Sequence, residues 1–363
     1  MSTRLTETAT LHPLVLPAQA DAGPTDEIRT YAEVRNRSIR ETTGRDDDAL
    51  SPDELLPVLH STRASRKMQW YVQDAGEMIA CVAVDMLQDA SADTAIATIA
   101  VLEKHWRRGI GTAALAALET ELRAAGVKTL LCWVEHHGEM QENLPSPTGF
   151  GAVPRDSTAR FLQRSGFALE QVERASELVF ATDTATRLDE ALAVAQEHAH
   201  EYRVVQWLLP TPPRFVDGYA WMKSRMSTDA PDAELGTPEE IWDADRVAEL
   251  EQRQAAKGFT IQVTAAEHIA TGELCAFNEL AIRASDPRGT SHQYDTLVLA
   301  GHRGHRLGML VKAAGLREWR NRFPESTRVI TYNAEENRPM LDINESIGFT
   351  PFAYEGAWKK DLT

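Results

Sequence analysis

Residues 97–112 read ATIAVLEKHWRRGIGT, and residues 295–309 read DTLVLAGHRGHRLGM. Each stretch has an apolar run typical of a β-strand, then a basic turn with glycine, then the start of a helical pattern. Free backbone N–H groups at such a helix start can hold a phosphate group, because no bulky side chain blocks its approach. Two such junctions indicate two similar halves, each a candidate binder of a phosphorylated cofactor.

The repeat extends beyond the junction. A glycine that opens a β-like run precedes the last junction glycine by 35 positions in the first half and by 36 in the second. A Gly-Phe pair recurs farther on, at residues 166–167 and 348–349. The glycines that define the spacing are Gly76, Gly111, Gly272 and Gly308. Self-similarity of whole segments indicates a duplicated module.

Length and composition fit a globular protein of two domains. The chain has 363 residues, of which 43% are hydrophobic and 25% charged. No apolar run is long enough to cross a membrane, and residues 1–24 do not read as a secretory signal. The formal net charge of −16 argues against a general nucleic-acid binder.

The cysteines show no zinc-type spacing, so we expect core thiols in a reducing compartment, no bound metal and a cytoplasmic protein. These cysteines are Cys81, Cys132 and Cys275.

Helical and strand patterns alternate along the chain. We expect helices over residues 25–43, 52–60, 112–125, 158–164, 183–200, 215–226, 238–256, 307–321 and 338–346. We expect strands over residues 14–16, 68–72, 78–87, 95–101, 129–134, 202–208, 259–264, 274–282, 294–300 and 328–333. The alternation predicts an α/β fold of the mixed-sheet α+β type in each half. The predicted domains are 1–182 and 201–363, joined by a linker helix over 183–200. The acidic run 46–48 predicts a solvent-exposed loop.

This order of elements, with its two junctions, resembles the GNAT superfamily of acyl-CoA N-acyltransferases. The family motif is Arg/Gln-x-x-Gly-x-Gly/Ala after the fourth strand. The resemblance covers most of both halves and implies a tandem GNAT protein, an architecture similar to that of mycothiol synthase. It also implies acetyl-CoA as cosubstrate. The loop N–H groups would bind its pyrophosphate, and the edge of the splayed fourth strand would hold its pantetheine arm.

The two copies depart from the motif differently. In the first, Gly109 and Gly111 match, but Trp106 stands where Arg or Gln is usual. In the second, Arg303 matches, but Arg306 stands where the middle glycine is usual. The resemblance implies cofactor contacts from Val101, Arg107, Arg108, Gly109, Ile110, Gly111, Thr112, Val298, Arg303, Gly304, His305, Arg306, Leu307, Gly308, Met309, Asn333 and Asn337.

Other interpretations of the glycines stay open. A Rossmann dinucleotide loop needs Gly-x-Gly-x-x-Gly and an acidic residue at the end of the next strand, and neither half supplies the full pattern. The glycines could also only cap helices, since a glycine pattern alone is weak evidence. Asn337 is equally explained as a helix-start residue.

GNAT proteins often carry a tyrosine four residues before the Gly-Phe pair, where it can protonate the departing CoA thiolate. Leu162 and Asn344 occupy that place here, and neither can donate a proton in that way.

Acyl transfer to an amine needs a base, because an alkyl amine of pKa about 10 is almost wholly protonated at neutral pH. A carboxylate, often acting through water, can remove that proton. The second half offers Glu279 on its third strand and Asp295 at the start of its fourth. The first half offers Asp85, with His136 and His137 as further candidates. Each of these residues is also explained as an ordinary surface or loop side chain.

The sequence therefore predicts an N-acetyltransferase that moves an acetyl group from acetyl-CoA to a small amine by direct attack in a ternary complex. The second half is expected to carry the catalysis. Two alternatives stay open. One is a catalytically silent CoA-binding or regulatory protein. The other is an aminoacyl transferase of related fold that uses aminoacyl-tRNA, against which the acidic balance counts. We expect neither nucleic acid nor membrane as a partner.

Overall fold

The computed structural model describes residues 2–88, 93–137 and 142–362. Its helices are α1 (Asp26–Thr43), α2 (Pro52–Leu59), α3 (Ile110–Ala124), α4 (Ser157–Arg164), α5 (Thr184–Gln196), α6 (Val216–Asp229), α7 (Ala244–Ala256), α8 (Leu307–Arg322) and α9 (Arg338–Ile347). Its strands are β1 (Thr3–Arg4), β2 (Ala9–Pro13), β3 (Ser65–Asp74), β4 (Glu77–Leu87), β5 (Thr94–Val101), β6 (Thr129–His136), β7 (Asn143–Pro145), β8 (Ala152–Pro154), β9 (Ala168–Val179), β10 (Tyr202–Leu208), β11 (Phe259–His268), β12 (Leu274–Arg283), β13 (Ser291–Val298), β14 (Arg328–Ala334) and β15 (Thr350–Asp361).

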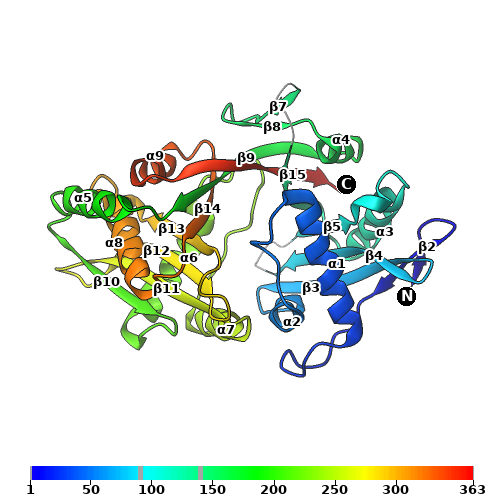
Figure 1. The fold of residues 1–363 in the computed structure, drawn as a ribbon, viewed down its shortest axis with the longest axis horizontal. Coiled ribbons are helices and arrows are strands. Elements are labelled where there is room, and N and C mark those ends of the chain that lie inside the picture. The colour runs from blue at the N-terminus through cyan, green and yellow to red at the C-terminus, as the bar shows by residue number, and fades with distance from the viewer. Residues whose placement is uncertain (1, 89–92, 138–141, 363) are drawn as a thin grey trace.

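One sheet runs through both halves of the described chain, in the order β1-β2-β3-β4-β5-β6-β15-β9-β14-β13-β12-β11-β10. Most neighbours are antiparallel, but β5–β6 and β13–β14 are parallel. Helices cover the sheet in two lobes, and β9 and β15 run across the top of both (Figure 1). The predicted mixed α/β fold with a repeated module is confirmed.

The two halves exchange their last strands. β15, from the C-terminal end of the chain, pairs with β6 of the first half and with β9. β9, from the first half, pairs with β14 of the second. Each half therefore needs a strand of the other to complete its share of the sheet. Trp358 of β15 is fully buried in the core of the first half.

Two main cores lie under the central helices. One packs α3 on the first half of the sheet, with Leu115, Leu118 and Leu122 buried. The other packs α8 on the second half. Leu188 and Leu192 of α5 belong to that second core, and Asp189 pairs with Arg317 of α8 at 3.1 Å. The predicted linker helix thus forms, and it packs as part of the second half. The predicted domain boundaries themselves stay a prediction.

The sequence prediction is wrong in a few segments. Residues 14–16 form no strand; the N-terminal strands are β1 and β2. The helix expected from residue 238 begins only at Ala244, because Asp243 accepts the hydrogen bond of Arg246 N–H and caps it. β9 was not predicted. The acidic loop 46–48 is not simply solvated, since Asp47 accepts hydrogen bonds from Thr290 at 2.7 Å and from Arg328.

None of the described helices combines the length and the apolar character needed to span a bilayer.

Candidate functional site

The two glycine junctions have the same backbone despite their different sequences. Two positions of each loop have positive φ: Arg107 at 58° and Gly109 at 79° in the first, Gly304 at 89° and Arg306 at 53° in the second. These positions correspond when the motifs are aligned on Gly111 and Gly308. Each loop therefore uses one glycine and one arginine for the same two left-handed residues. The arginine that departs from the motif keeps the turn at a cost of about 1–2 kcal/mol.

The tryptophan that replaces the motif arginine makes the same hydrogen bond. Trp106 Nε1 donates to the carbonyl oxygen of Val101 at 2.6 Å, and Arg303 Nε donates to that of Val298 at 3.3 Å. In both halves this bond ties the loop to the last residue of the preceding strand. Although Trp106 departs from the family motif, it still anchors the first loop to the strand before it.

Both loops present unused backbone donors. Among the described residues, the N–H groups of 107–112 and of 304–309 find no acceptor. A Cβ built at Gly109 or at Gly304 would meet nothing within 4 Å, so the approach to these donors is open. A Cβ at Gly308 would lie 2.9 Å from the side chain of Ile343. This cradle at a helix start fits the pyrophosphate of acetyl-CoA.

The strand before each loop separates from its parallel neighbour. β5 pairs with β6 only over 94–96, and β13 pairs with β14 only over 291–292. Beyond these residues each strand has an open edge toward a gap, which we call the first wedge (β5–β6) and the second wedge (β13–β14). Unpaired strand N–H and C=O groups can bind an extended amide chain, so both wedges fit a pantetheine arm.

The two wedges differ in their side chains. Gln293 is the first residue of β13 beyond its pairing with β14, at the narrow end of the second wedge. Its Nε2 donates to Thr331 at 3.2 Å, while its buried Oε1 finds no partner among the described residues. The matching first-half positions are Ala97 and Cys132. A buried polar atom without a partner is costly and points to a ligand at this place.

A β-bulge explains why the repeat is one residue longer in the second half. β12 and β13 pair regularly up to Asn278 and Thr296 and again from Leu280 and Gln293, so two residues of β13 oppose Glu279 alone. β4 and β5 pair without such an irregularity. Bulges bend a strand and re-aim its side chains, and they are common beside active sites. The extra residue therefore distinguishes the second wedge.

The predicted base candidates Glu279 and Asp295 lie together on this bulged pair. Lys223 of α6 donates to both carboxylates, at 3.3 Å to Glu279, and Tyr219 also donates to Glu279. Glu279 is buried, whereas the Asp295 side chain is 35% exposed. Glu279 is thus a bonded carboxylate rather than a free one. The sequence analysis missed Lys223 and Tyr219, because nothing in the pattern of α6 distinguishes them.

The pKa values follow from burial and from these charges. Burial raises the pKa of Glu279 above its ordinary value, and the nearby Lys223 only partly opposes this. Burial by itself lowers the pKa of Lys223, but the carboxylates of Asp295 and Glu279 outweigh it and raise that pKa. Lys223 is therefore an ammonium at neutral pH.

The first-half candidates already have partners of their own. Asp85 accepts from Ser65 and pairs with Lys67 at 2.8 Å. His136 is buried, with Nδ1 at 3.1 Å from Asp156 and Nε2 accepting from Trp358 at 3.0 Å, so both ring nitrogens are engaged.

The remaining predicted residues lie around the loops. His137 pairs with Glu135 at 2.8 Å. Arg108 pairs with Asp74 at 2.7 Å. Asn337 precedes α9 without a side-chain capping bond, and Asn333 accepts from Asn344 at 2.7 Å.

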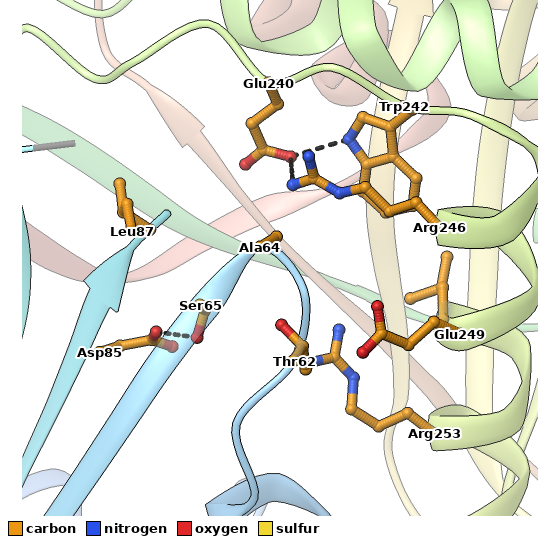
Figure 2. Close-up of a pocket in the computed structure, with 11 residues that line it drawn as sticks. Thr62, Ala64, Ser65, Asp85, Leu87, Glu240, Trp242, Arg246, Glu249 and Arg253 are labelled. Atoms are coloured by element: carbon orange, nitrogen blue, oxygen red, sulfur yellow. Dashed lines mark hydrogen bonds and ion pairs between the residues drawn. The ribbon is translucent and has the colours of Figure 1, made fainter. Parts of the chain in front are cut away.

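A pocket of about 200 Å³ lies between the halves, lined by the ends of β3 and β4 and by α7 (Figure 2). Figure 2 shows Glu240 accepting from Trp242 and Arg246, at 2.8 and 2.7 Å, with Asp85 on the opposite wall. The Trp242 ring also contacts the Lys223 ammonium, 5.2 Å from its centroid. Trp242 therefore contacts both this pocket and the Glu279 cluster.

One group near the second loop has ligand types suited to a metal ion. The ligand atoms of Glu273, Cys275 and His302 lie within 4.8 Å of one another. Tyr202 Oη lies 2.9 Å from Nδ1 of His302. The sequence analysis missed this group because its members are dispersed along the chain.

Comparisons with known proteins agree with this geometry. Residues 32–146 match the profile of the Acetyltransferase (GNAT) family. No curated protein matches the chain. A solved tandem GNAT protein from the clavulanic acid biosynthesis pathway is 22% identical, with a TM-score of 0.72 over 98% of this chain and 99% of that one.

Two further solved structures share the fold. A GCN5-related N-acetyltransferase from Sphaerobacter thermophilus is 14% identical, with a TM-score of 0.63 over 99% and 97% of the two chains. A glucosamine N-acetyltransferase region of a fungal multi-domain GH3 β-N-acetylglucosaminidase is 12% identical, with a TM-score of 0.57 over 97% of this chain and 38% of that one. Residues 32–146 therefore match the GNAT family profile, and the chain as a whole has the fold of a solved tandem GNAT protein.

Proposed function

We propose that the protein is an N-acetyltransferase that moves an acetyl group from acetyl-CoA to a small amine. The observation that carries this proposal is the second wedge. Unused loop N–H groups, an open strand edge and a bulged strand with buried Glu279 opposite it occur there on one strand–loop–helix unit. The amine would attack the thioester directly in a ternary complex.

Glu279 and Asp295 are the proposed bases. A carboxylate accepts a proton best when its pKa is near the working pH, and burial moves the pKa of Glu279 in that direction. Lys223 would hold both carboxylates in place. The pocket beyond Trp242 supports entry of the amine from between the halves.

The cofactor contacts proposed for the first wedge serve binding rather than catalysis. Its strand pair has no bulge, and Ala97 lies at the narrow-end position that Gln293 occupies in the second wedge. This asymmetry supports a silent first module. A wholly silent CoA-binding protein is the second candidate, because Glu279 is already hydrogen-bonded to Tyr219 and Lys223. An aminoacyl transferase is disfavoured by the net charge of −16.

A small-molecule acceptor, with no nucleic-acid or membrane partner, and a cytoplasmic location complete the proposal. The three buried, unpaired cysteine thiols support a reducing compartment.

The test is a screen of amine classes with acetyl-CoA, read out as free CoA thiol, with calorimetric binding of acetyl-CoA in parallel. Gly308→Asp should abolish turnover and weaken binding, because the carboxylate repels the pyrophosphate and its Cβ meets Ile343. Gly111→Asp, the matched change in the first loop, should lose at most one binding site and keep turnover. Binding of acetyl-CoA without amine-dependent thiol release in any class would favour the silent protein. Unchanged binding in both folded variants would contradict the cofactor assignment.

A further inference from the structure

Lys312 is a buried lysine without a counter-ion among the described residues. Its side chain is fully buried on α8, and among the described residues Nζ donates only to Asn344 Oδ1, at 2.7 Å. Burial lowers the pKa of Lys312 to about 7, and no charged side chain is among the causes. A buried ammonium without an anion is costly, so the site is complete only when an anionic group lies near it.

The hydrogen bond from Lys312 fixes the orientation of the Asn344 amide. As an ammonium, Lys312 can only donate, so the amide oxygen of Asn344 faces it and the amide nitrogen faces the other way. That nitrogen donates to Asn333 Oδ1 at 2.7 Å. Asn333 lies on β14 beyond the residues where β14 pairs with β13. The chain of bonds therefore runs from the buried face of α8 to the second wedge.

The first half has no polar group at any of the three matching positions. Four residues after the last loop glycine stands Leu115 instead of Lys312, and four before the Gly-Phe pair stands Leu162 instead of Asn344. By strand register, Val134 corresponds to Asn333. All three lie in the apolar core of the first half or against it. The three residues lie on α8, α9 and β14, and all three differ from their first-half counterparts in the same way. This indicates that they act together.

We propose that Lys312, Asn344 and Asn333 form the site that holds the sulfur of the cofactor as a thiolate in the second wedge. This inference rests on the proposed function. In the transfer step the amine nitrogen bonds to the thioester carbon and gives its proton to the base. The carbon–sulfur bond breaks, and the sulfur keeps the electron pair.

The amide N–H groups would then stabilise the thiolate, and its charge would supply the anion that Lys312 lacks. Lys312 acts through Asn344 and is a positioning residue.

The test compares CoA with desulfo-CoA, which differs only at the sulfur, by calorimetry at about pH 7.5. A hydrogen-bonded thiolate should make CoA bind about ten- to a hundredfold more tightly than desulfo-CoA. Ultraviolet absorbance of the complex should show a thiolate, although a free thiol of pKa about 8.5 is mostly protonated at this pH.

Lys312→Met and Asn344→Leu should abolish the preference and the thiolate signal while desulfo-CoA affinity is kept, which also shows that the variants fold. Asn321→Leu, at an exposed asparagine of the same helix, is the control and should change nothing. Equal affinities of the wild-type protein for the two ligands, or variants that keep the preference, would overturn the sulfur site. Failure of both ligands to bind would instead overturn the proposed function.

Discussion

Lys312 lies at a core position of α8, next to the buried residues Val311 and Ala313. A leucine at the matching position of α3 packs without cost, whereas the lysine pays a desolvation penalty and keeps one hydrogen bond. Arg306 shows the same principle in the backbone, since it adopts a left-handed conformation that glycine would adopt without strain. Both residues weaken the fold at the second site.

The lowered pKa of Lys312 makes stability depend on pH. Between about pH 7, its folded value, and 10.5, its ordinary value, the unfolded chain holds a proton that the folded chain lacks. Stability therefore rises with pH across this window, and the penalty is fully present below it.

Compared with Lys312→Met, the wild-type protein should gain a few kcal/mol in free energy of unfolding from about pH 6 to 9. Urea denaturation of both proteins at the two pH values measures the gain. A difference that does not change with pH would show that Lys312 does not titrate in this window.

At the scale of elements, the strand pairs distinguish the two halves. β12–β13 carries a bulge, and the two residues that oppose Glu279 are Tyr294 and Asp295. β4–β5 is regular and places Asp85 opposite Ile96. The regular pair keeps its side chains in the ordinary alternation, whereas the bulge brings the Asp295 carboxylate toward Lys223, which also holds Glu279.

This difference predicts unequal effects when the candidate base of each half is replaced by its amide. Glu279→Gln should lower the turnover rate by about 10²–10⁴-fold at neutral pH, with recovery at higher pH as the amine loses its proton unaided. Asp85→Asn should leave the rate nearly unchanged. Steady-state kinetics from about pH 7 to 10, with the KM for acetyl-CoA as a check on folding, measures both. A crippled Asp85→Asn beside a normal Glu279→Gln would place the catalysis in the first half.

At the scale of the molecule, the exchanged strands make the halves interdependent. β15 lies between β6 and β9, so the centre of the sheet is built from both halves of the chain. The pairing of β15 with β6 and β9 also brings three carboxylates close together. Glu355 faces Glu135 and Glu173 across neighbouring strands, and burial together with these carboxylates raises its pKa to about 8.

The fragment 1–200 should therefore not fold alone, because β6 and β9 lack the strand between them. Co-expressed with 201–363, it should form a stable one-to-one complex, since all strand pairs are then restored. Size-exclusion chromatography and circular dichroism of the single and the co-expressed fragments distinguish the cases. A cooperative thermal transition of 1–200 by itself, close to that of the whole protein, would contradict the interdependence.

The sequence by itself determined the features that depend on neighbouring residues. Most helices and strands follow from local periodicity, and both loops follow from their glycine and basic residues. The one-residue difference between the spacings of 35 and 36 positions already indicates an extra residue in the second half. The spacing alone does not show that this residue forms a bulge in β13. The site residues proposed at the loops and at Glu279 and Asp295 came from the same local signals and from family resemblance.

Only the tertiary structure decided which distant residues meet. Trp358 and His136 are 222 positions apart in the chain and share a hydrogen bond, because β15 crosses into the first half. A strand pattern predicts a strand but not its partner, since any exposed edge can accept it. The ion pairs of Lys223 and the isolation of Lys312 follow from side chains on other helices and strands. The energy of a buried charge depends on those neighbours, and the sequence around each lysine does not contain them.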